Sequence, residues 1–201
     1  MSTRAVQVGL GLMALIGVVL AVVLYFPETD TFRGTLYDPA LPAPEISLER
    51  DNGSDFRLSE LRGNVVLLFF GYTSCPDVCP TTLSELRKVN EQLGSAAAQI
   101  RVVYVTVDPD RDTPDKVQKY VSIFNPSFIG LSGSLEDLQP VWRDYGVYRE
   151  VEQVSSSAAG YLVNHTARVY VIDREGNLRL SYSYGTPTED IVHDLKILFK
   201  Q

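Results

Sequence analysis

Two cysteines four residues apart are the side chains of this 201-residue sequence best suited to chemistry. Cys75 and Cys79 are the only cysteines, and they lie in the segment Cys-Pro-Asp-Val-Cys-Pro. A separation of four residues places two side chains on one face of a helical turn, so both sulfurs can meet one ion or each other. A helix that begins here also favours thiolate, the form that binds metals and attacks disulfides. A purely stapling disulfide is the weaker interpretation, because the closed loop is tiny and removes little chain entropy.

His165 separates a metal site from a dithiol redox pair. It lies just before a predicted strand, 168–173, whose start would approach the cysteine loop if both belong to one sheet. Two thiolates and one imidazole form a soft set of three ligands that suits Cu(I), and that could take Cu(II) with an added ligand. Zinc would ordinarily need a fourth protein ligand or a catalytic water, and neither a third cysteine nor a second nearby histidine is evident. We therefore expect copper, preferably Cu(I), at Cys75, Cys79 and His165.

Two further titratable residues, Asp108 and His193, are candidates for a place near the site. Asp108 follows the predicted strand 102–107, so it belongs to the same end of the sheet as the cysteines. It either caps a turn or stands beside the ligands as a supporting or docking carboxylate. His193 lies among apolar residues of the last predicted helix, and we expect it to be structural.

Hydrophobic runs and capping residues divide the chain into strands and helices. Continuous apolar runs at 65–70 and 102–107 predict two strands that are buried on both faces. The pairs Thr113–Pro114 and Ser134–Asp137 mark the starts of two helices. The predicted elements, in order, are a hairpin at 46–50 and 56–58, a strand at 65–70, a helix at 81–93, a strand at 102–107, helices at 113–124 and 134–145, strands at 168–173 and 178–184, and a helix at 188–199.

This order is βαβαββα with an extra β-hairpin in front, which is the thioredoxin-like arrangement of the α/β class. The cysteines then follow a buried strand and precede a helix, at the carboxyl ends of the strands, where ligands bind in open α/β sheets. The folded domain is expected at 45–201. Within it, the stretch 151–160 is predicted to be an exposed loop and, just before His165, a candidate for a mobile flap.

The first 26 residues predict a membrane anchor. Residues 8–26 carry no charged side chain, and as a helix they would span about 28 Å, close to the hydrocarbon thickness of a bilayer. A cleaved signal peptide is the competing interpretation, but the exit at Leu24–Glu28 offers no small-residue cleavage site. Residues 27–44, with four prolines, are predicted to form a semi-extended tether.

Charge predicts the orientation of the anchor and excludes one class of partner. Arg4 precedes the apolar segment whereas Glu28 and Asp30 follow it, so the folded domain is expected on the periplasmic or another exoplasmic side of a single-pass protein. Thiols in such a compartment tend to oxidise unless a metal or a reductant holds them. A net charge of −7 and the absence of a basic cluster argue against nucleic-acid binding.

Four ordered motifs resemble the Sco/SenC family of copper chaperones for cytochrome c oxidase assembly. They are Gly71–Pro80, Val107–Pro114, Phe128–Gly133 and Val163–Thr166. The match extends over nearly the whole globular part, and the N-terminal anchor also fits the family.

The resemblance implies that Cys75, Cys79 and His165 are copper ligands. It also implies delivery of copper to the binuclear copper centre of a cytochrome c oxidase subunit, or reduction of the thiols there, with a thiol reductant or another copper carrier as a second partner. The chain departs from the family at Asn164, where many relatives carry an acidic residue before the histidine. Asn164 therefore reduces the local negative charge that would favour Cu(II).

The main alternative is an enzyme, a membrane-tethered thiol-disulfide oxidoreductase or peroxidase. Cys75 would be its nucleophile and Cys79 its resolving thiol. A thioredoxin places a cis-proline opposite its cysteines, and the segment 162–166 contains no proline, which argues against a general oxidoreductase. A purely structural scaffold would leave both cysteines and His165 unexplained.

Overall fold

The computed structural model describes residues 11, 13–18, 31–153 and 160–201. The chain divides into two compact units, residues 1–31 and residues 32–201. Residues 11 and 13–18 are helical, and the rest of the predicted anchor at 8–26 lies outside the described residues. None of the helices in the described part of the chain combines the length and the apolar character that crossing a bilayer requires.

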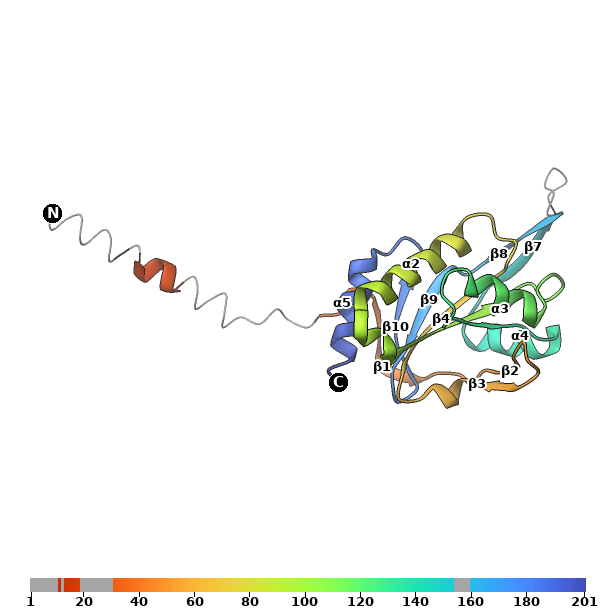
Figure 1. Ribbon diagram of the computed structural model, residues 1–201, viewed down its shortest axis with the longest axis horizontal. Helices are drawn as coiled ribbons and strands as arrows, with labels where there is room; N and C mark the ends of the chain where they lie inside the picture. Colours follow the sequence, from red (N-terminus) through yellow and green to blue (C-terminus); the bar gives the residue numbers. More distant parts are fainter. Residues whose placement is uncertain (1–10, 12, 19–30, 154–159) are drawn as a thin grey trace. The chain divides into compact units, whose positions relative to one another are not determined.

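The larger unit is built on a mixed sheet with the strand order β1-β10-β9-β4-β5-β6 (Figure 1). Strands β4 (Val65–Gly71) and β5 (Ile100–Thr106) are parallel, whereas β9 (Arg168–Ile172) and β10 (Asn177–Ser183) run antiparallel to their neighbours. Every residue of β4 is buried, because helices and loops cover the sheet on both faces. This continuous apolar strand places the chain segment that follows it at the carboxyl edge of the sheet.

The helices lie close to where the sequence predicts them. Helix α2 (Val78–Leu93) packs beside α5 (Thr188–Leu198), as Figure 1 shows. Helices α3 (Pro114–Ser122) and α4 (Leu135–Asp144) begin with the predicted caps, since Thr113 accepts a hydrogen bond from the N–H of Lys116 and Ser134 accepts one from Asp137. The extra hairpin is also confirmed, as β2 (Ser47–Glu49) paired with β3 (Asp55–Arg57). Short 3₁₀ helices, η1 (Leu58–Leu61) and η2 (Gly94–Gln99), lead into β4 and β5.

Strand β1 (Thr35–Pro42) lies inside the range 27–44 that was predicted as a tether. It pairs antiparallel with β10, and the compact unit begins at Phe32 rather than near Glu45. The prolines that suggested a tether are compatible with this strand, because an edge strand has one side on which no neighbour needs an N–H group.

Two further segments differ from the predictions around the site. Part of the predicted loop 151–160 is strand, because β7 (Arg149–Gln153) pairs with β8 (Tyr161–His165) in a separate two-stranded sheet. Residues 154–159, where the candidate flap would be, lie outside the described residues. The flap therefore stays a prediction, and the strand pairing shows what holds its two ends.

Strand β6 (Ile129–Leu131) was not predicted as a strand, and it forms the edge of the sheet beside β5. It is short, and its glycine weakens the pattern on which strand prediction depends. A Cβ atom on Gly130 would lie 2.8 Å from the backbone of Val117, so glycine allows α3 to approach this strand.

Candidate metal centre

The two cysteines flank the start of α2, directly beyond the carboxyl end of β4. Cys75 lies in a turn closed by a 3.2 Å hydrogen bond from its own N–H to the carbonyl of Tyr72, and Cys79 is the second residue of the helix. The N–H of Cys79 donates to the sulfur of Cys75 at 3.4 Å. Pro80 costs no helical hydrogen bond here, because the first N–H groups of a helix have no intrahelical partner. The sequence thus directs the sulfur of Cys75 at the positive end of a helix.

The two sulfurs differ in exposure and in charge. Cys75 is partly exposed and Cys79 is fully buried, and both are free thiols. A hydrogen bond from the thiol of Cys79, aided by the backbone of Cys79, lowers the pKa of Cys75 to about 4 although its partial burial opposes this. The same hydrogen bond and burial raise the pKa of Cys79 well above that of a free thiol. The reduced pair therefore holds one thiolate, on Cys75, and one thiol.

His165 reaches the cysteines from the end of β8. Its Nε2 atom lies 3.7 Å from the sulfur of Cys79, and its Nδ1 atom lies 3.1 Å from the carbonyl oxygen of Thr166. A carbonyl only accepts hydrogen bonds, so Nδ1 carries the proton and Nε2 presents its lone pair to the sulfurs. The ring is held edge-on against Tyr72, with 5.9 Å between centroids. This is the arrangement by which proteins orient a metal-binding imidazole.

The distances allow a test of whether these residues fit a metal ion. For bonds of roughly 2.3 Å to sulfur and 2.0–2.1 Å to nitrogen, a separation of 3.7 Å between Cys79 and His165 corresponds to an angle of about 116° at a shared ion, close to trigonal. Over residues 31–153 and 160–201, however, no three His, Cys, Asp or Glu side chains are already grouped to hold an ion. The Cys79–His165 distance fits a shared ion, and binding one requires a rearrangement that brings the Cys75 sulfur into the same group.

The loop 107–113 holds the cysteine side of the site through Asp112. The buried carboxylate of Asp112 accepts hydrogen bonds from the N–H and the hydroxyl of Thr73, at 2.9 and 2.5 Å, and from the hydroxyl of Thr106 at 2.8 Å. The hydroxyl of Ser132 donates to the backbone carbonyl of Asp112, which ties the end of β6 to the same loop. The chain just before Cys75 is thereby attached to the end of β5.

The same loop holds the histidine side through Asp108, the predicted supporting carboxylate. Asp108 is fully buried, and it accepts hydrogen bonds from Arg111 at 2.5 Å and from the hydroxyl of Tyr161 at 2.8 Å. Arg111 also donates to the carbonyl of Tyr161 and stacks on its ring at 3.6 Å. Arg149 of β7 donates to the carbonyl of Val107. Asp108 thus acts on the strand that carries His165, and not on the two sulfurs directly.

Asn164, the residue that departs from the family pattern, faces a carboxylate across the hairpin. Its amide donates to Glu152 of β7 at 2.9 Å. Asn164 thus pairs with a carboxylate of the neighbouring strand, whereas an acidic residue at position 164 would face that carboxylate as a like charge.

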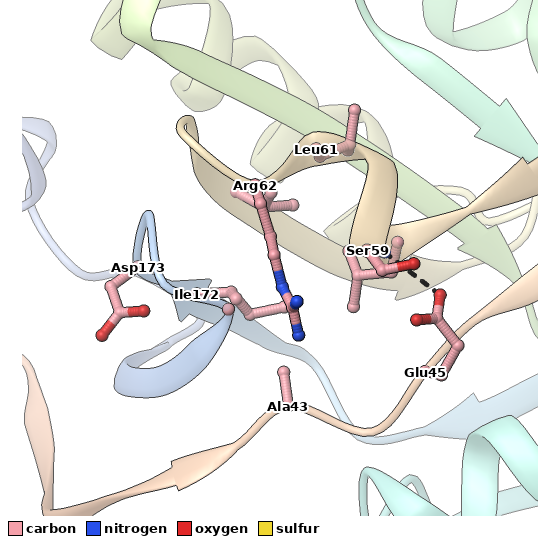
Figure 2. Close-up of a pocket in the computed structure, with 10 residues that line it drawn as sticks. Ala43, Glu45, Ser59, Leu61, Arg62, Ile172 and Asp173 are labelled. Carbon is pink, nitrogen blue, oxygen red and sulfur yellow. Dashed lines mark hydrogen bonds between the residues drawn. The ribbon is translucent and has the colours of Figure 1, made fainter.

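Two pockets show which end of the sheet carries the site. One, of about 200 Å³, opens beside the candidate ligands and is lined by residues of the cysteine loop and of β8, among them Cys75, Asp77, Val163 and His165. The other, shown in Figure 2, lies at the opposite end of β4 between Ala43, Ser59, Arg62 and Ile172, and no cysteine or histidine lines it. It has room for about one water molecule. The pocket beside Cys75 and His165 is the one that belongs to the chemistry.

Comparison with known proteins identifies the family of the chain. The family model described as SCO1/SenC matches residues 38–200. The chain belongs to the SCO1/SenC family. A putative copper-binding protein of Stutzerimonas stutzeri is 35% identical over 170 residues, which cover 80% of this chain and 82% of the relative.

Two solved structures of Sco proteins share the fold. Apo Sco1 from Thermus thermophilus has a TM-score of 0.76 and 41% identity, covering 86% of this chain and 99% of its own. Arabidopsis thaliana ScoI with copper bound has a TM-score of 0.73 and 32% identity, covering 79% and 98%. The resemblance inferred from the four motifs and the thioredoxin-like Sco fold are thus confirmed.

His193 lies apart from this site, as the sequence predicts. Its Nδ1 atom lies 2.9 Å from the buried carboxylate of Asp194, which also accepts hydrogen bonds from Arg33, Gly34 and Tyr182. These contacts attach the start of the folded unit to α5, and they serve the fold.

Sequence reasoning missed Asp112, Arg111 and Tyr161 as residues that position the ligands. The charged residues of the motif 107–114 can be read from the sequence, but their hydrogen-bond partners, Thr73 and Tyr161, come from distant parts of the chain. The signal that could have found Asp112 is the pair of hydroxyl residues, Thr73 and Thr106, at the ends of two adjacent predicted strands.

Proposed function

We propose that this protein is a copper chaperone that binds one Cu(I) ion through Cys75, Cys79 and His165. In this proposal it delivers the ion to the binuclear copper site of a cytochrome c oxidase subunit. The observation that carries the proposal is the 3.7 Å approach of the His165 Nε2 lone pair to the sulfur of Cys79. A dithiol catalyst has no need of an imidazole at that position. The structures of Sco proteins with copper bound, from Arabidopsis thaliana and Bradyrhizobium japonicum, support the choice of metal.

The difference in exposure between the ligands suits a protein that must release its cargo. Cys79 is buried and His165 is held by the hairpin, whereas Cys75 is partly exposed at the pocket. A thiolate of the acceptor can approach from the Cys75 side and exchange for that ligand first. A disulfide between the cysteines would remove both sulfur ligands, so the cycle requires a thiol reductant, or another copper carrier that delivers to the reduced pair.

We also propose that residues 8–26 anchor the chain as a single pass, with residues 32–201 on the periplasmic or exoplasmic side. The support is the length of the uncharged segment and the placement of Arg4 before it. Protease treatment of intact cells or spheroplasts, with the chain tagged at either end, tests this orientation.

The experiment for copper binding is a competition titration of the reduced protein with a Cu(I) chelator. Wild type should bind one ion per chain, His165→Ala should lose at least tenfold in affinity, and the control His193→Ala should match wild type. Transfer is then followed by mixing the loaded protein with the soluble copper-bearing domain of the oxidase subunit. Unchanged affinity in His165→Ala would rule out the three-ligand site, and no transfer to the subunit would rule out delivery.

A second function is favoured by the charge difference between the two sulfurs. In this function the Cys75 thiolate attacks a disulfide of the oxidase subunit, which forms a mixed disulfide and releases one thiolate of the subunit. Cys79 then gives its proton to that thiolate and attacks the sulfur of Cys75, which releases the second thiolate of the subunit. The chain ends as the Cys75–Cys79 disulfide and the subunit as a dithiol, so two electrons pass to the subunit. This reaction predicts turnover without metal and little effect of His165→Ala.

A further inference from the structure

Tyr104 brings a phenol hydroxyl to the sulfur of Cys79 from inside the sheet. It is a fully buried residue of β5, and its ring packs on Phe69 of β4 at 5.8 Å between centroids. A Cβ atom on Gly71 would lie 2.6 Å from Tyr104 Oη and 2.8 Å from Cys79 Sγ. The hydroxyl and the sulfur therefore face one small space, which exists because residue 71 has no side chain.

The Tyr104 hydroxyl is a hydrogen-bond donor that the reduced, metal-free site leaves unused. In the part of the chain that the structure describes, this buried oxygen has no hydrogen-bond partner. An unpaired buried hydroxyl is costly, and the polar atom beside it is a thiol, which accepts hydrogen bonds only weakly. A thiolate in the same place would be a strong acceptor. The site is thus arranged for a charge that only the ligand form of Cys79 carries.

The surroundings of the two cysteines explain why such a donor is needed at Cys79. The sulfur of Cys75 accepts an N–H from the start of α2 and is partly exposed to solvent. Cys79 has no solvent exposure, so water cannot stabilise a negative charge on its sulfur.

We propose that Tyr104 donates a hydrogen bond to Cys79 Sγ when that sulfur is a thiolate, and so stabilises the buried cysteine in its metal-binding form. This inference rests on the proposed copper site. Tyr104 acts through Cys79, and it is a positioning residue rather than a ligand. Hydrogen bonds to a cysteine sulfur are known to tune the electronic properties of copper–thiolate sites.

The test is Tyr104→Phe, with Tyr120→Phe as the matched control. The centroid of the Tyr120 ring lies 6.0 Å from that of Tyr104, and among the described residues its hydroxyl is also buried without a hydrogen-bond partner. Each variant therefore removes one buried, unpaired hydroxyl from this pair of rings. We expect Tyr104→Phe to bind Cu(I) roughly 10- to 100-fold more weakly and Tyr120→Phe to match wild type. Thermal unfolding of the metal-free, reduced proteins should show no loss of stability in either variant, because no hydrogen bond is removed.

A spectroscopic readout separates this role from a structural one. Loss of a hydrogen bond raises the energy of the sulfur lone pair, so the thiolate-to-Cu(II) charge-transfer band should move to lower energy in Tyr104→Phe and stay in place in Tyr120→Phe. Equal Cu(I) affinity and an unmoved band in Tyr104→Phe would overturn the inference while leaving the copper site intact.

Failure of the proposed function gives a different result. If wild type binds no Cu(I), the copper proposal fails, and Cd(II), a probe that also requires both thiolates, still tests Tyr104. Weaker Cd(II) binding by Tyr104→Phe alone supports the hydrogen bond, and equal Cd(II) binding contradicts it. A wild-type protein that takes up neither ion overturns both proposals.

Discussion

The cysteine half and the histidine half of the candidate site are held in different ways. The cysteines lie between β4 and α2, elements of the main sheet and its covering helices, and Asp112 attaches the loop before them to β5. The histidine ends β8, which belongs to a separate two-stranded sheet. That hairpin is attached through Asp108, Arg111 and Tyr161. The buried core thus holds the cysteine half in place, whereas a few polar contacts hold the histidine half.

The loop 107–113 links the two halves, because it supplies both Asp108 and Asp112. A chaperone needs ligands that are aligned well enough to bind an ion and loose enough to release it. The core aligns the buried Cys79, the hairpin aligns His165 through fewer contacts, and the partly exposed Cys75 is the ligand from which release begins. Four predictions test this division, in order of decreasing effect.

The largest effect concerns the charge on Cys75. Because its pKa is lowered to about 4, Cys75 should stay thiolate at every pH above that value, and its alkylation rate by iodoacetamide in the reduced protein should be nearly flat from pH 5 to 8. An ordinary thiol would speed up about a thousandfold over that range. Mass spectrometry of the alkylated sites gives the profile, with Cys79 unreacted because it is buried and protonated.

Cys79→Ala is the control for that profile. The hydrogen bond from Cys79 is the main cause of the low pKa of Cys75, so the rate in this variant should regain a steep rise with pH. A steep profile in wild type would contradict the thiolate assignment.

The second prediction breaks the cysteine half. Asp112→Ala leaves Thr73 and Thr106 without their acceptor, and we expect a loss of about 3 kcal/mol in the free energy of unfolding. Urea denaturation measures it. The control is Asp115→Ala, in the first turn of α3, which removes an exposed ion pair with Lys119. It should change the free energy of unfolding by less than about 0.5 kcal/mol. Equal effects in the two variants would show that Asp112 does not hold the loop.

The third prediction loosens the histidine half. Tyr161→Phe removes the hydroxyl that donates to Asp108, and we expect about tenfold weaker Cu(I) binding with faster amide exchange in β7 and β8. The main sheet should exchange as in wild type. Tyr148→Phe is matched, because it removes an exposed hydroxyl that pairs with Glu150 at the start of the same hairpin. Slower amide exchange in Tyr161→Phe, or equal Cu(I) affinity in the two variants, would show that the Tyr161–Asp108 hydrogen bond does not position His165.

The smallest effect comes from Asn164→Asp. The new carboxylate adds negative charge beside His165 but faces Glu152, so we expect Cu(II) affinity to rise a few-fold and stability to fall by about 0.5 kcal/mol. Calorimetric titration with Cu(II) and urea denaturation check the two changes. The double variant with Glu152→Gln should recover the stability. A fall in Cu(II) affinity would show that local charge is not what limits it.

The sequence was sufficient for the parts of the fold that local patterns encode. Strands β4 and β5 are continuous apolar runs, and α3 and α4 begin at capping residues, so their positions follow from short segments. Strands β1 and β6 escaped prediction because prolines and a glycine interrupt them, and pairing with β10 and β5 makes them strands. Such pairings join residues far apart in the chain, and local propensity does not report them.

The candidate site divides in the same way. Cys75 and Cys79 are identified by spacing and by their place after a buried strand. His165 was proposed from its place before a predicted strand and was secured by the motif resemblance, and its distance from Cys79 could come only from the folded chain. Tyr104 gave no signal, because a tyrosine in a buried apolar strand is expected to serve packing alone.

X-ray absorption at the copper edge of the Cu(I)-loaded, reduced protein tests the central claim most directly. The account predicts two sulfur neighbours and one nitrogen neighbour for the ion in wild type, and loss of the nitrogen in His165→Ala with both sulfurs kept. Identical spectra for wild type and His165→Ala, or an ion bound by sulfur alone, would contradict a site built from the two cysteines and His165.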